Sequence, residues 1–234
     1  MSSIRSLILL VALASFCAAQ SEPTIFPVRV SIFYSVYCEN CRGFLTGKFA
    51  PFYDTFKSWI DLDLIPFGNS TDLGGFEFSC PEGTDECIAN KWHTCTDRIY
   101  KGRYPKEVAA FVNCTLWRDD GFFEDVQKCA EENYLTFLPI QHCVNELEGK
   151  IHLAANAART KNHEPAITSY PTIEFNGTYD QELHDLAVKD FKAAICSQLK
   201  DPQTGAGPKA CNFGTMITPF LSVLLLSLWI LLKL

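Results

Sequence analysis

The sequence has no dense run of lysine and arginine, and its acidic residues outnumber its basic ones. It contains 27 Asp and Glu against 20 Lys and Arg, which gives a formal net charge of -7. Binding to nucleic-acid phosphates needs clustered positive charge, so the composition argues against a nucleic-acid partner. The hydrophobic fraction of 47% is that of a globular chain rather than a disordered one.

The middle of the chain also lacks the close cysteine pairs of a structural zinc site. Six residues separate Cys80 from Cys87, and seven separate Cys87 from Cys95. Zinc sites usually pair cysteines about two to four residues apart. The five histidines are scattered along the sequence. We therefore predict neither a metal nor a cofactor.

What the sequence does contain is cysteine, eleven in all. Cys17 lies in an N-terminal segment that we expect to be removed, which leaves ten. An even number of cysteines in a secreted chain indicates a disulfide framework. Apart from Cys38 and Cys41, which are discussed below, we predict eight structural cysteines and leave their pairing open: Cys80, Cys87, Cys95, Cys114, Cys129, Cys143, Cys196 and Cys211.

Residues 1–19 have the pattern of a secretory signal peptide. Arg5 precedes an apolar run over residues 7–13, and small residues lead to a cleavage site expected after Ala19. The run is too short to span a bilayer. A buried N-terminal helix is the alternative.

Three Asn-x-Ser/Thr sequons agree with entry into the secretory pathway. They predict N-glycosylation at Asn69, Asn113 and Asn176. The sequon at Asn113 includes Cys114, so early disulfide pairing of Cys114 would block it.

The C-terminal region changes composition at residue 201. Residues 201–215 are polar and rich in Gly, Pro and Ala, which is typical of a linker. Residues 216–232 are uncharged and apolar. Together with the small residues 205–207, this tail fits the signal for a GPI anchor. A membrane span and a helix packed on the domain are the alternatives, so a membrane tether stays open.

A Cys-x-x-Cys pair stands between a predicted strand and a predicted helix. Residues 28–34 are β-branched and aromatic, which favours a strand. Cys38 and Cys41 follow, and apolar residues then recur at helical spacing to about Ile60, with a break expected near Ala50 because of Pro51. This order is typical of a thioredoxin-type redox site. A purely structural cysteine pair is the alternative.

The position of Cys38 predicts its role in a redox site. The thiolate is the attacking species, and a cysteine at a helix N-terminus gains from the unpaired N–H groups and the helix dipole. Cys38 is therefore the predicted nucleophile, and Cys41 is the predicted resolving thiol. Glu39 lies between them and should disfavour the Cys38 thiolate to some extent.

The rest of the chain completes an α/β pattern. Residues 62–67 predict a second strand, which forms a parallel βαβ unit with the first. Residues 80–162 are mostly helical, with separate helices expected around residues 108–112, 122–129 and 144–158.

A third strand is predicted at residues 172–175, followed by a hairpin turn, another strand and one helix over residues 181–199. The predicted fold class is α/β. It is a thioredoxin-like domain over residues 25–200, with a large disulfide-rich helical insertion at about 80–165.

Tyr170-Pro171 precedes the predicted third strand. In thioredoxin-type folds a cis-proline faces the Cys-x-x-Cys, and the residue before it offers backbone to an extended substrate. Proline is nearly the only residue for which a cis bond is accessible, at about 0.5–1 kcal/mol. We predict that Tyr170 and Pro171 bind substrate, with an ordinary strand-initiating proline as the alternative.

The stretch from Cys80 to Cys95 reads CPEGTDECIANKWHTC. It resembles the signature of the gamma-interferon-inducible lysosomal thiol reductase family, C-Q-H-G-x2-E-C-x2-N-x4-C. Pro81 and Glu82 depart from the Gln-His pair. Residues 156–160, Asn-Ala-Ala-Arg-Thr, resemble the segment before the cis-proline region in the same family. The resemblance covers about residues 28–211. Six residues match in register: Cys80, Gly83, Glu86, Cys87, Asn90 and Cys95.

The resemblance implies a thiol reductase of the lysosome or secretory route that acts on disulfides in protein substrates, with a small thiol as reductant. Cys38 and Cys41 match the active-site pair of the family. The other eight cysteines would then form four bridges. Eight cysteines can pair in 105 ways, so the connectivity stays open. A disulfide oxidase or isomerase using the same site remains open, as does a non-catalytic binding protein.

Overall fold

The computed structural model describes residues 27–117, 122–199 and 207–211. The predicted signal peptide, most of the predicted linker and the apolar tail at 216–232 lie outside the described residues. Within the described ranges, no helix has the length and apolar character needed to cross a membrane.

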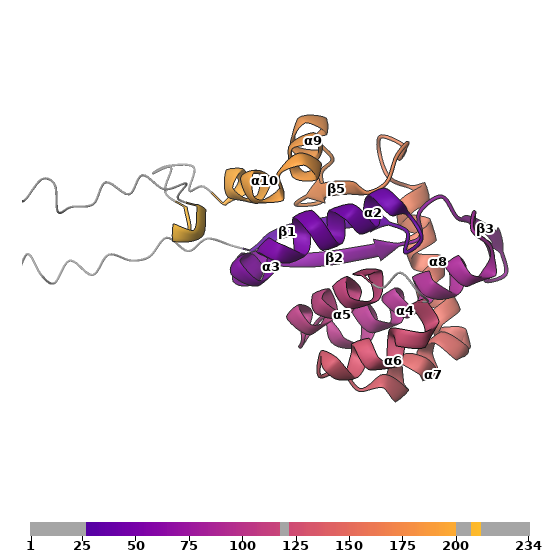
Figure 1. The fold of residues 1–234 in the computed structure, drawn as a ribbon. Helices are drawn as coiled ribbons and strands as arrows, with labels where there is room; N and C mark the ends of the chain where they lie inside the picture. Colours follow the sequence, from indigo (N-terminus) through magenta and orange to yellow (C-terminus); the bar gives the residue numbers. More distant parts are fainter. Residues whose placement is uncertain (1–26, 118–121, 200–206, 212–234) are drawn as a thin grey trace, which may run out of the picture.

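Three strands form the central sheet in the order β2-β1-β5 (Figure 1). β1 (Val28–Tyr34) pairs in parallel with β2 (Ile60–Pro66) and antiparallel with β5 (Thr172–Phe175). All residues of β1 except Arg29 are buried, because helices cover both faces of the sheet. The predicted parallel βαβ unit is confirmed.

The connection from β1 to β2 is a helix interrupted near its middle. α2 (Glu39–Phe44) leads into a π-helical turn at Leu45–Phe49, and α3 (Ala50–Phe56) follows, with a 3-10 turn at Lys57–Trp59 before β2. Pro51 lies in the first turn of α3, where its missing N–H is least disruptive. The break predicted near Ala50 is confirmed, and the wider π-helical turn accommodates it.

A short hairpin follows β2 that the sequence analysis did not predict. β3 (Thr71–Gly74) pairs antiparallel with β4 (Glu77–Ser79), and Gly74, which ends β3, and Gly75 after it have positive φ. Every residue of β3 is exposed. A strand that buries no face produces no apolar alternation, so the pattern gave no signal.

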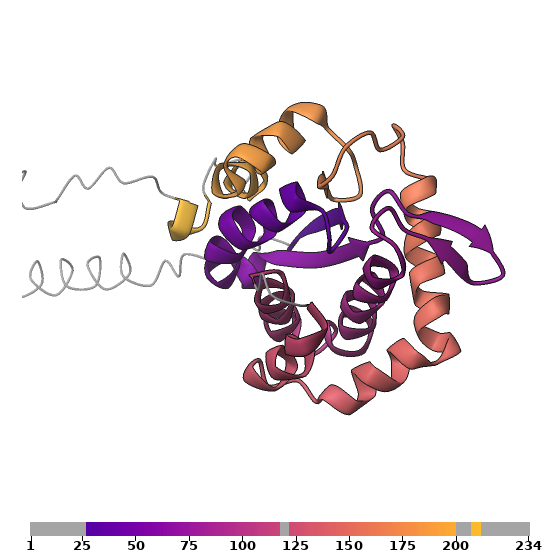
Figure 2. The same ribbon diagram turned by 45° about the vertical axis from the view of Figure 1, so that its right-hand side comes forward.

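Helices occupy the chain from β4 to the loop before β5. They are α4 (Thr84–Tyr100), α5 (Pro105–Trp117), α6 (Phe122–Glu132), α7 (Phe137–Asn145) and α8 (Leu147–Lys161). In Figures 1 and 2, α4 to α7 lie on one side of the sheet, while α9 (Gln181–Lys189) and α10 (Phe191–Gln198) lie on the other.

The helix predicted over residues 144–158 is present as α8, but it begins at Leu147 and Val144 belongs to α7. Glu146 has extended backbone, with φ -95° and ψ 171°, so α7 ends there and α8 begins. A Cβ on Gly149 would lie 2.5 Å from the carbonyl oxygen of Cys143. Glycine therefore permits the close approach of α8 to the end of α7, a constraint that apolar periodicity cannot show.

The C-terminal part differs from prediction at two places. The predicted strand after Asn176-Gly177 is reduced to one bridge between Phe175 and Thr178. The single helix predicted over residues 181–199 is wrong, because Asp190 ends α9 in a non-helical conformation. Its carboxylate then accepts a hydrogen bond from Ala193 N at 2.9 Å and caps α10.

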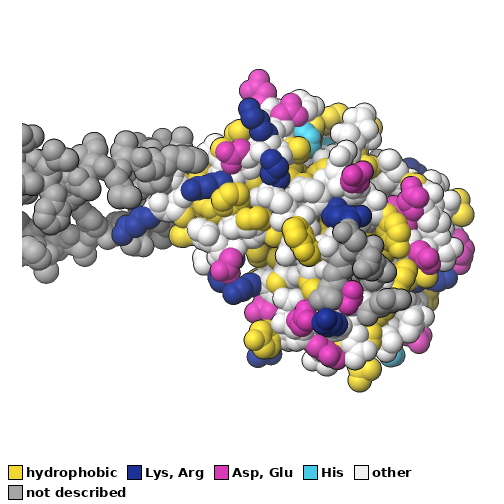
Figure 3. Space-filling view, viewed as in Figure 1, with side chains coloured by type: hydrophobic (Ala, Val, Ile, Leu, Met, Phe, Trp, Pro, Cys, Tyr) yellow, Lys and Arg dark blue, Asp and Glu magenta, His cyan; other side chains and the backbone are white. Residues whose placement is uncertain are grey.

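Five disulfides join the described elements. Besides Cys38–Cys41, the pairs are Cys80–Cys87, Cys95–Cys143, Cys114–Cys129 and Cys196–Cys211. Cys211 closes a 3-10 turn at Lys209–Cys211, so this part of the segment predicted as a linker is fastened to α10. On the face drawn in Figure 3, acidic and basic side chains are interspersed.

Candidate active site

Cys38 is the N-cap of α2, as its place between strand and helix predicted. Its sulfur accepts a hydrogen bond from the backbone N–H of Cys41 at 3.1 Å. Cys38 is partly exposed, whereas Cys41 lies one turn deeper and is fully buried. The two sulfurs are bonded, so the structure is that of the oxidised pair. One sulfur thus faces a cleft while the other lies beneath it.

The loop before β5 brings a second element against Cys38. The Tyr170–Pro171 peptide bond is cis, which confirms the prediction of a cis-proline here. The carbonyl oxygen of Tyr170 lies 3.8 Å from the Cys38 sulfur, although the two residues are 132 positions apart in sequence. Burial raises the pKa of the Tyr170 hydroxyl to about 12, so this side chain stays neutral.

A cleft of about 360 Å³ opens beside the Cys38 sulfur. One wall comes from Asn40 on α2 and the loop before β5, and another from the segment that leads into α4. Asn69 and Tyr170 also line a larger neighbouring cavity of about 780 Å³, between β3 and the end of α8. Residues that line the first cleft include Ser35, Cys38, Asn69, Glu82, Glu86 and Tyr170.

The turn that leads into Cys38 is bonded to side chains of α4. Ser35 Oγ donates a hydrogen bond to the Glu86 carboxylate, and Val36 N donates one to Asn90 Oδ1 at 3.0 Å. The backbone N–H of Cys38 donates to the Ser35 carbonyl at 3.2 Å. The sequence comparison had matched Glu86 and Asn90 to a family pattern without giving them a role. Ser35 carried no sequence signal, because it only ends an apolar strand.

The three predicted glycosylation residues lie in different surroundings. Asn69 is exposed in the turn after β2 and lines the cleft, and Asn176 is exposed beside β1. Asn113 lies within α5, is partly buried and precedes Cys114, which is bonded to Cys129. The glycans themselves stay predictions.

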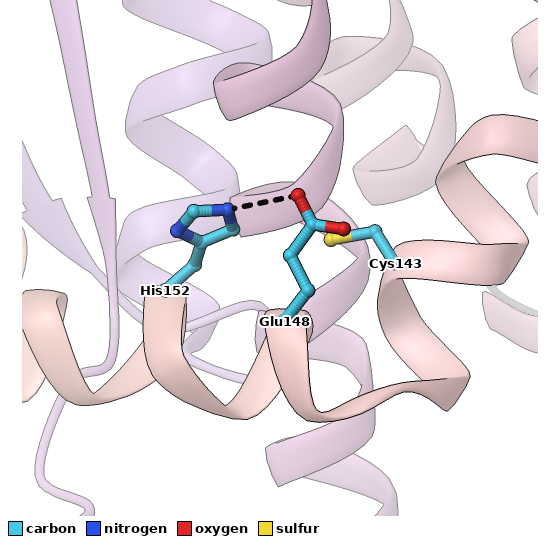
Figure 4. A group of neighbouring side chains, drawn as sticks. All are labelled: Cys143, Glu148 and His152. Carbon is cyan, nitrogen blue, oxygen red and sulfur yellow. Dashed lines mark hydrogen bonds and ion pairs between the residues drawn. The ribbon is translucent and has the colours of Figure 1, made fainter.

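A group of three side chains with metal-ligand chemistry lies at the junction of α7 and α8 (Figure 4). His152 Nε2 and the Glu148 carboxylate are 3.4 Å apart. The third member, Cys143, has its sulfur committed to the disulfide with Cys95. Because a metal-binding cysteine must be a free thiolate, this group offers only two ligands.

Comparison with known proteins agrees with this geometry. The family model described as gamma interferon inducible lysosomal thiol reductase (GILT) matches residues 29–133. A gamma-interferon-inducible lysosomal thiol reductase-like protein of Anopheles gambiae is 31% identical over 209 residues, 83% of this chain and 84% of the relative. The gamma-interferon-inducible lysosomal thiol reductase of Carassius auratus is 30% identical over 197 residues, 80% of this chain and 73% of the relative.

A solved structure supports the fold independently. The crystal structure of Chlamydia trachomatis DsbA superposes with a TM-score of 0.52 at 14% identity, and the match covers 76% of this chain and 89% of that one. The relatives decide against the non-catalytic binding protein that the sequence had left open. The chain therefore belongs to the gamma-interferon-inducible lysosomal thiol reductase family, and it is a thiol reductase with a thioredoxin-like fold.

Proposed function

We propose that this chain reduces disulfide bonds of protein substrates along the endolysosomal or secretory route, with Cys38 as the nucleophile and Cys41 as the resolving thiol. The observation that supports the proposal is one partly exposed and one buried sulfur at the start of α2, beside the Tyr170 carbonyl. Tyr170 and Pro171 would present backbone to an extended substrate segment. The compartment is inferred from the predicted signal peptide and the lysosomal names of the relatives.

The proposed cycle balances electrons between two disulfides. The Cys38 thiolate attacks one sulfur of the substrate bond, forms a mixed disulfide and expels the other substrate sulfur as a thiolate. Cys41, as a thiolate, then attacks the Cys38 sulfur. The substrate leaves with both thiols reduced, and the Cys38–Cys41 disulfide forms. A small thiol compound returns two electrons and two protons to that disulfide, and is itself oxidised.

The difference in exposure gives each cysteine its place in the cycle. Cys41 is fully buried, so a substrate disulfide cannot reach it, whereas the Cys38 sulfur lines the cleft. The backbone N–H of Cys41, in the first turn of α2, donates to the Cys38 sulfur and favours its thiolate. Cys41 needs only to reach Cys38, and their Cα atoms are 5.2 Å apart.

The direction of the reaction depends on the reduction potential of the Cys38–Cys41 pair. Equilibration with glutathione at several ratios of reduced to oxidised form measures it. A reductase requires a potential near that of thioredoxin, about -270 mV, and an oxidase one near that of DsbA, about -120 mV. A value close to the latter would replace reduction by oxidation as the direction of catalysis.

The test of the proposal is insulin-disulfide reduction by the full mature chain at pH 4.5 and pH 7. The wild type should turn over at both values, and Cys38→Ser should reduce the rate to background, because no other thiol lines the cleft among the described residues. A variant that lacks the Cys196–Cys211 bridge is the matched control, since it also loses cysteines but leaves the cleft intact. Activity of Cys38→Ser equal to wild type would refute the assignment.

A further inference from the structure

The turn Ser35–Cys38 carries the reactive sulfur, and its first two residues are both fixed by α4. Glu86 accepts from the Ser35 hydroxyl, and Asn90 Oδ1 accepts from Val36 N at 3.0 Å. Asn90 Nδ2 also donates a hydrogen bond to Ser35 Oγ at 3.3 Å. The fourth residue of the turn, Cys38, closes it through its N–H to the Ser35 carbonyl. We call the side chains of Glu86 and Asn90, with Ser35, the turn clamp.

Every member of the turn clamp is buried. Ser35 and Glu86 are each 3% exposed, and Asn90 is fully buried. Buried polar groups are costly unless they are hydrogen-bonded. The second Glu86 oxygen accepts from Glu82 N at 2.8 Å, so both carboxylate oxygens are engaged. Loss of one member would therefore leave the other members with unsatisfied polar atoms.

Helix geometry and the local fold direct the Glu86 and Asn90 side chains toward the turn at Ser35. Glu86 and Asn90 are four residues apart on α4, so they project from the same face of the helix. Cys87 between them is bonded to Cys80, which fastens the first turn of α4. Gly68 leaves room for the Ser35 side chain, because a Cβ at position 68 would lie 2.5 Å from Ser35 Cβ. Two separate segments of chain, α4 and the turn at Gly68, thus converge on Ser35.

The clamp matters most in the reduced enzyme. While Cys38 and Cys41 are bonded, the disulfide itself ties the Cys38 sulfur to α2. Reduction breaks that disulfide, and the reduced enzyme is the form in which Cys38 attacks the substrate. The contacts that then remain to hold the sulfur are the backbone bond within the turn, the N–H of Cys41 and the turn clamp, all of which are present in the oxidised structure. Reaction rates fall steeply when a reacting group is displaced by about 1 Å.

We propose that Glu86 and Asn90 are positioning residues for disulfide reduction, which keep the Cys38 sulfur at the N-terminus of α2 and facing the Tyr170 carbonyl after the active-site disulfide is reduced. The proposal rests on the assignment of Cys38 as nucleophile and adds a role for two residues that do not touch the substrate disulfide. It also gives a physical purpose to the Glu and Asn of the stretch between Cys80 and Cys95.

The test compares variants of the full mature chain in insulin reduction, with kcat and KM measured separately. Asn90→Ala removes the acceptor for Val36 N and should lower kcat about 10–100-fold with KM changed less than about twofold, as expected for misplacement of a reacting group. Asn90→Asp keeps the Oδ1 acceptor for Val36 N but loses the Nδ2 donor and adds a buried acid beside Glu86, so it should recover only part of that loss, and more of it at pH 4.5 than at pH 7. Glu86→Gln keeps an oxygen for Ser35 and should fall between wild type and Asn90→Ala.

A second readout separates positioning from general destabilisation. The rate of Cys38 alkylation in the reduced protein is followed against pH, and Asn90→Ala should move the midpoint to higher pH, because the sulfur leaves the helix N-terminus. Thr96→Val is the matched control. Thr96 is also fully buried on α4, and its hydroxyl donates to Trp92 O of the same helix at 2.9 Å, so the variant should lose stability but keep kcat and the midpoint.

Wild-type kcat and alkylation midpoint in Asn90→Ala would overturn the proposal, as would an equal loss of kcat in Thr96→Val. If Asn90→Ala does not fold, Ser35→Ala and Glu86→Gln carry the same comparison, because each changes the clamp from a different side. The two proposals fail in different ways. An active Cys38→Ser overturns the nucleophile assignment, whereas an inactive Cys38→Ser with a fully active Asn90→Ala overturns the turn clamp alone.

Discussion

Gly68, in the turn after β2, is a residue whose missing side chain shapes the site. Its φ is +62°, a conformation that side-chain-bearing residues rarely adopt, and a Cβ would collide with Ser35. Gly68→Ala should therefore destabilise the fold by about 1–3 kcal/mol and slow insulin reduction, because Ser35 must move. Urea unfolding and turnover measure the two effects.

Gly43→Ala is the matched control for this prediction. Gly43 lies within α2, close to the redox pair in sequence, and a Cβ there meets no atom within 4 Å. Alanine is the better helix former by about 1 kcal/mol, so this variant should be as stable as wild type or more so. Equal behaviour of the Gly68 and Gly43 variants would contradict the account of Ser35 packing.

The sequence predicted the residues whose chemistry is local. Cys38 as the cap of a helix and Pro171 as a cis-proline both follow from short patterns, and the structure has both features. The partners of those residues depend on contacts across the fold. Ser35 meets Glu86 across 51 positions of sequence, and no short pattern encodes that meeting.

Elements were predicted best where one face is buried throughout. β1, β2 and β5 were found because most of their residues are apolar and nearly all are buried. Boundaries inside helical stretches were missed, because apolar spacing continues through Glu146 and Asp190 while the backbone does not. The capping carboxylate of Asp190 was visible in the sequence and could have located the second of these breaks.

Two disulfides at the element scale should differ in their effect on stability. Cys95–Cys143 joins α4 to α7 across 48 residues, and Cys114–Cys129 joins α5 to α6 across 15. In the chain-entropy model, the longer loop contributes about 4 kcal/mol and the shorter about 3 kcal/mol. Replacement of both cysteines by alanine should therefore lower the free energy of unfolding more for the first pair. A larger loss from the α5–α6 pair would show that native-state strain, not loop length, governs these bridges.

Three buried groups give the whole molecule opposing responses to pH. Burial lowers the pKa of His93 to about 3. The free energy of unfolding therefore falls as pH drops from 6.5 toward 3, because the unfolded chain takes up a proton that the buried ring does not. Burial raises the pKa of Asp63, but Arg159 and Lys101 outweigh burial and lower that pKa to about 2. The stability that the ionised Asp63 contributes is therefore lost as pH falls from about 4 toward 2. Burial raises the pKa of Asp97 to about 6, against Lys101, and stability is lost as pH rises from 4 through 6.

Asp97→Asn tests this balance. The ionised Asp97 carboxylate should destabilise the wild type by about 3 kcal/mol at pH 7 and scarcely at all at pH 4. The variant should therefore exceed the wild type in free energy of unfolding at pH 7 and equal it at pH 4. Asp61→Asn, at the exposed ion pair with Arg29, should change little at either pH. An equal difference at both pH values would show that Asp97 does not titrate in this range.

A glycan on Asn69 would stand at the rim shared by the cleft and its neighbouring cavity. Thr71→Ala removes this sequon but keeps Asn69, and Thr71 is exposed. Thr71→Ala and the glycosylated wild type should reduce oxidised glutathione equally. The variant should reduce insulin at least about twofold faster, since a bulky surface glycan on Asn69 obstructs only the larger substrate. Thr178→Ala removes the Asn176 sequon outside the cleft and should change neither rate. Equal insulin rates in wild type and both variants would show that the Asn69 glycan does not limit access of the protein substrate.

Trapping of the mixed disulfide tests the central claim most directly. Without a resolving thiol, the intermediate between enzyme and substrate persists. Cys41→Ser, reduced and mixed with insulin at pH 4.5, should accumulate a covalent adduct, and peptide mass mapping should place the bond on Cys38. An adduct on another cysteine, or its absence under conditions where the wild type turns over, would contradict the assignment of Cys38 as the attacking sulfur.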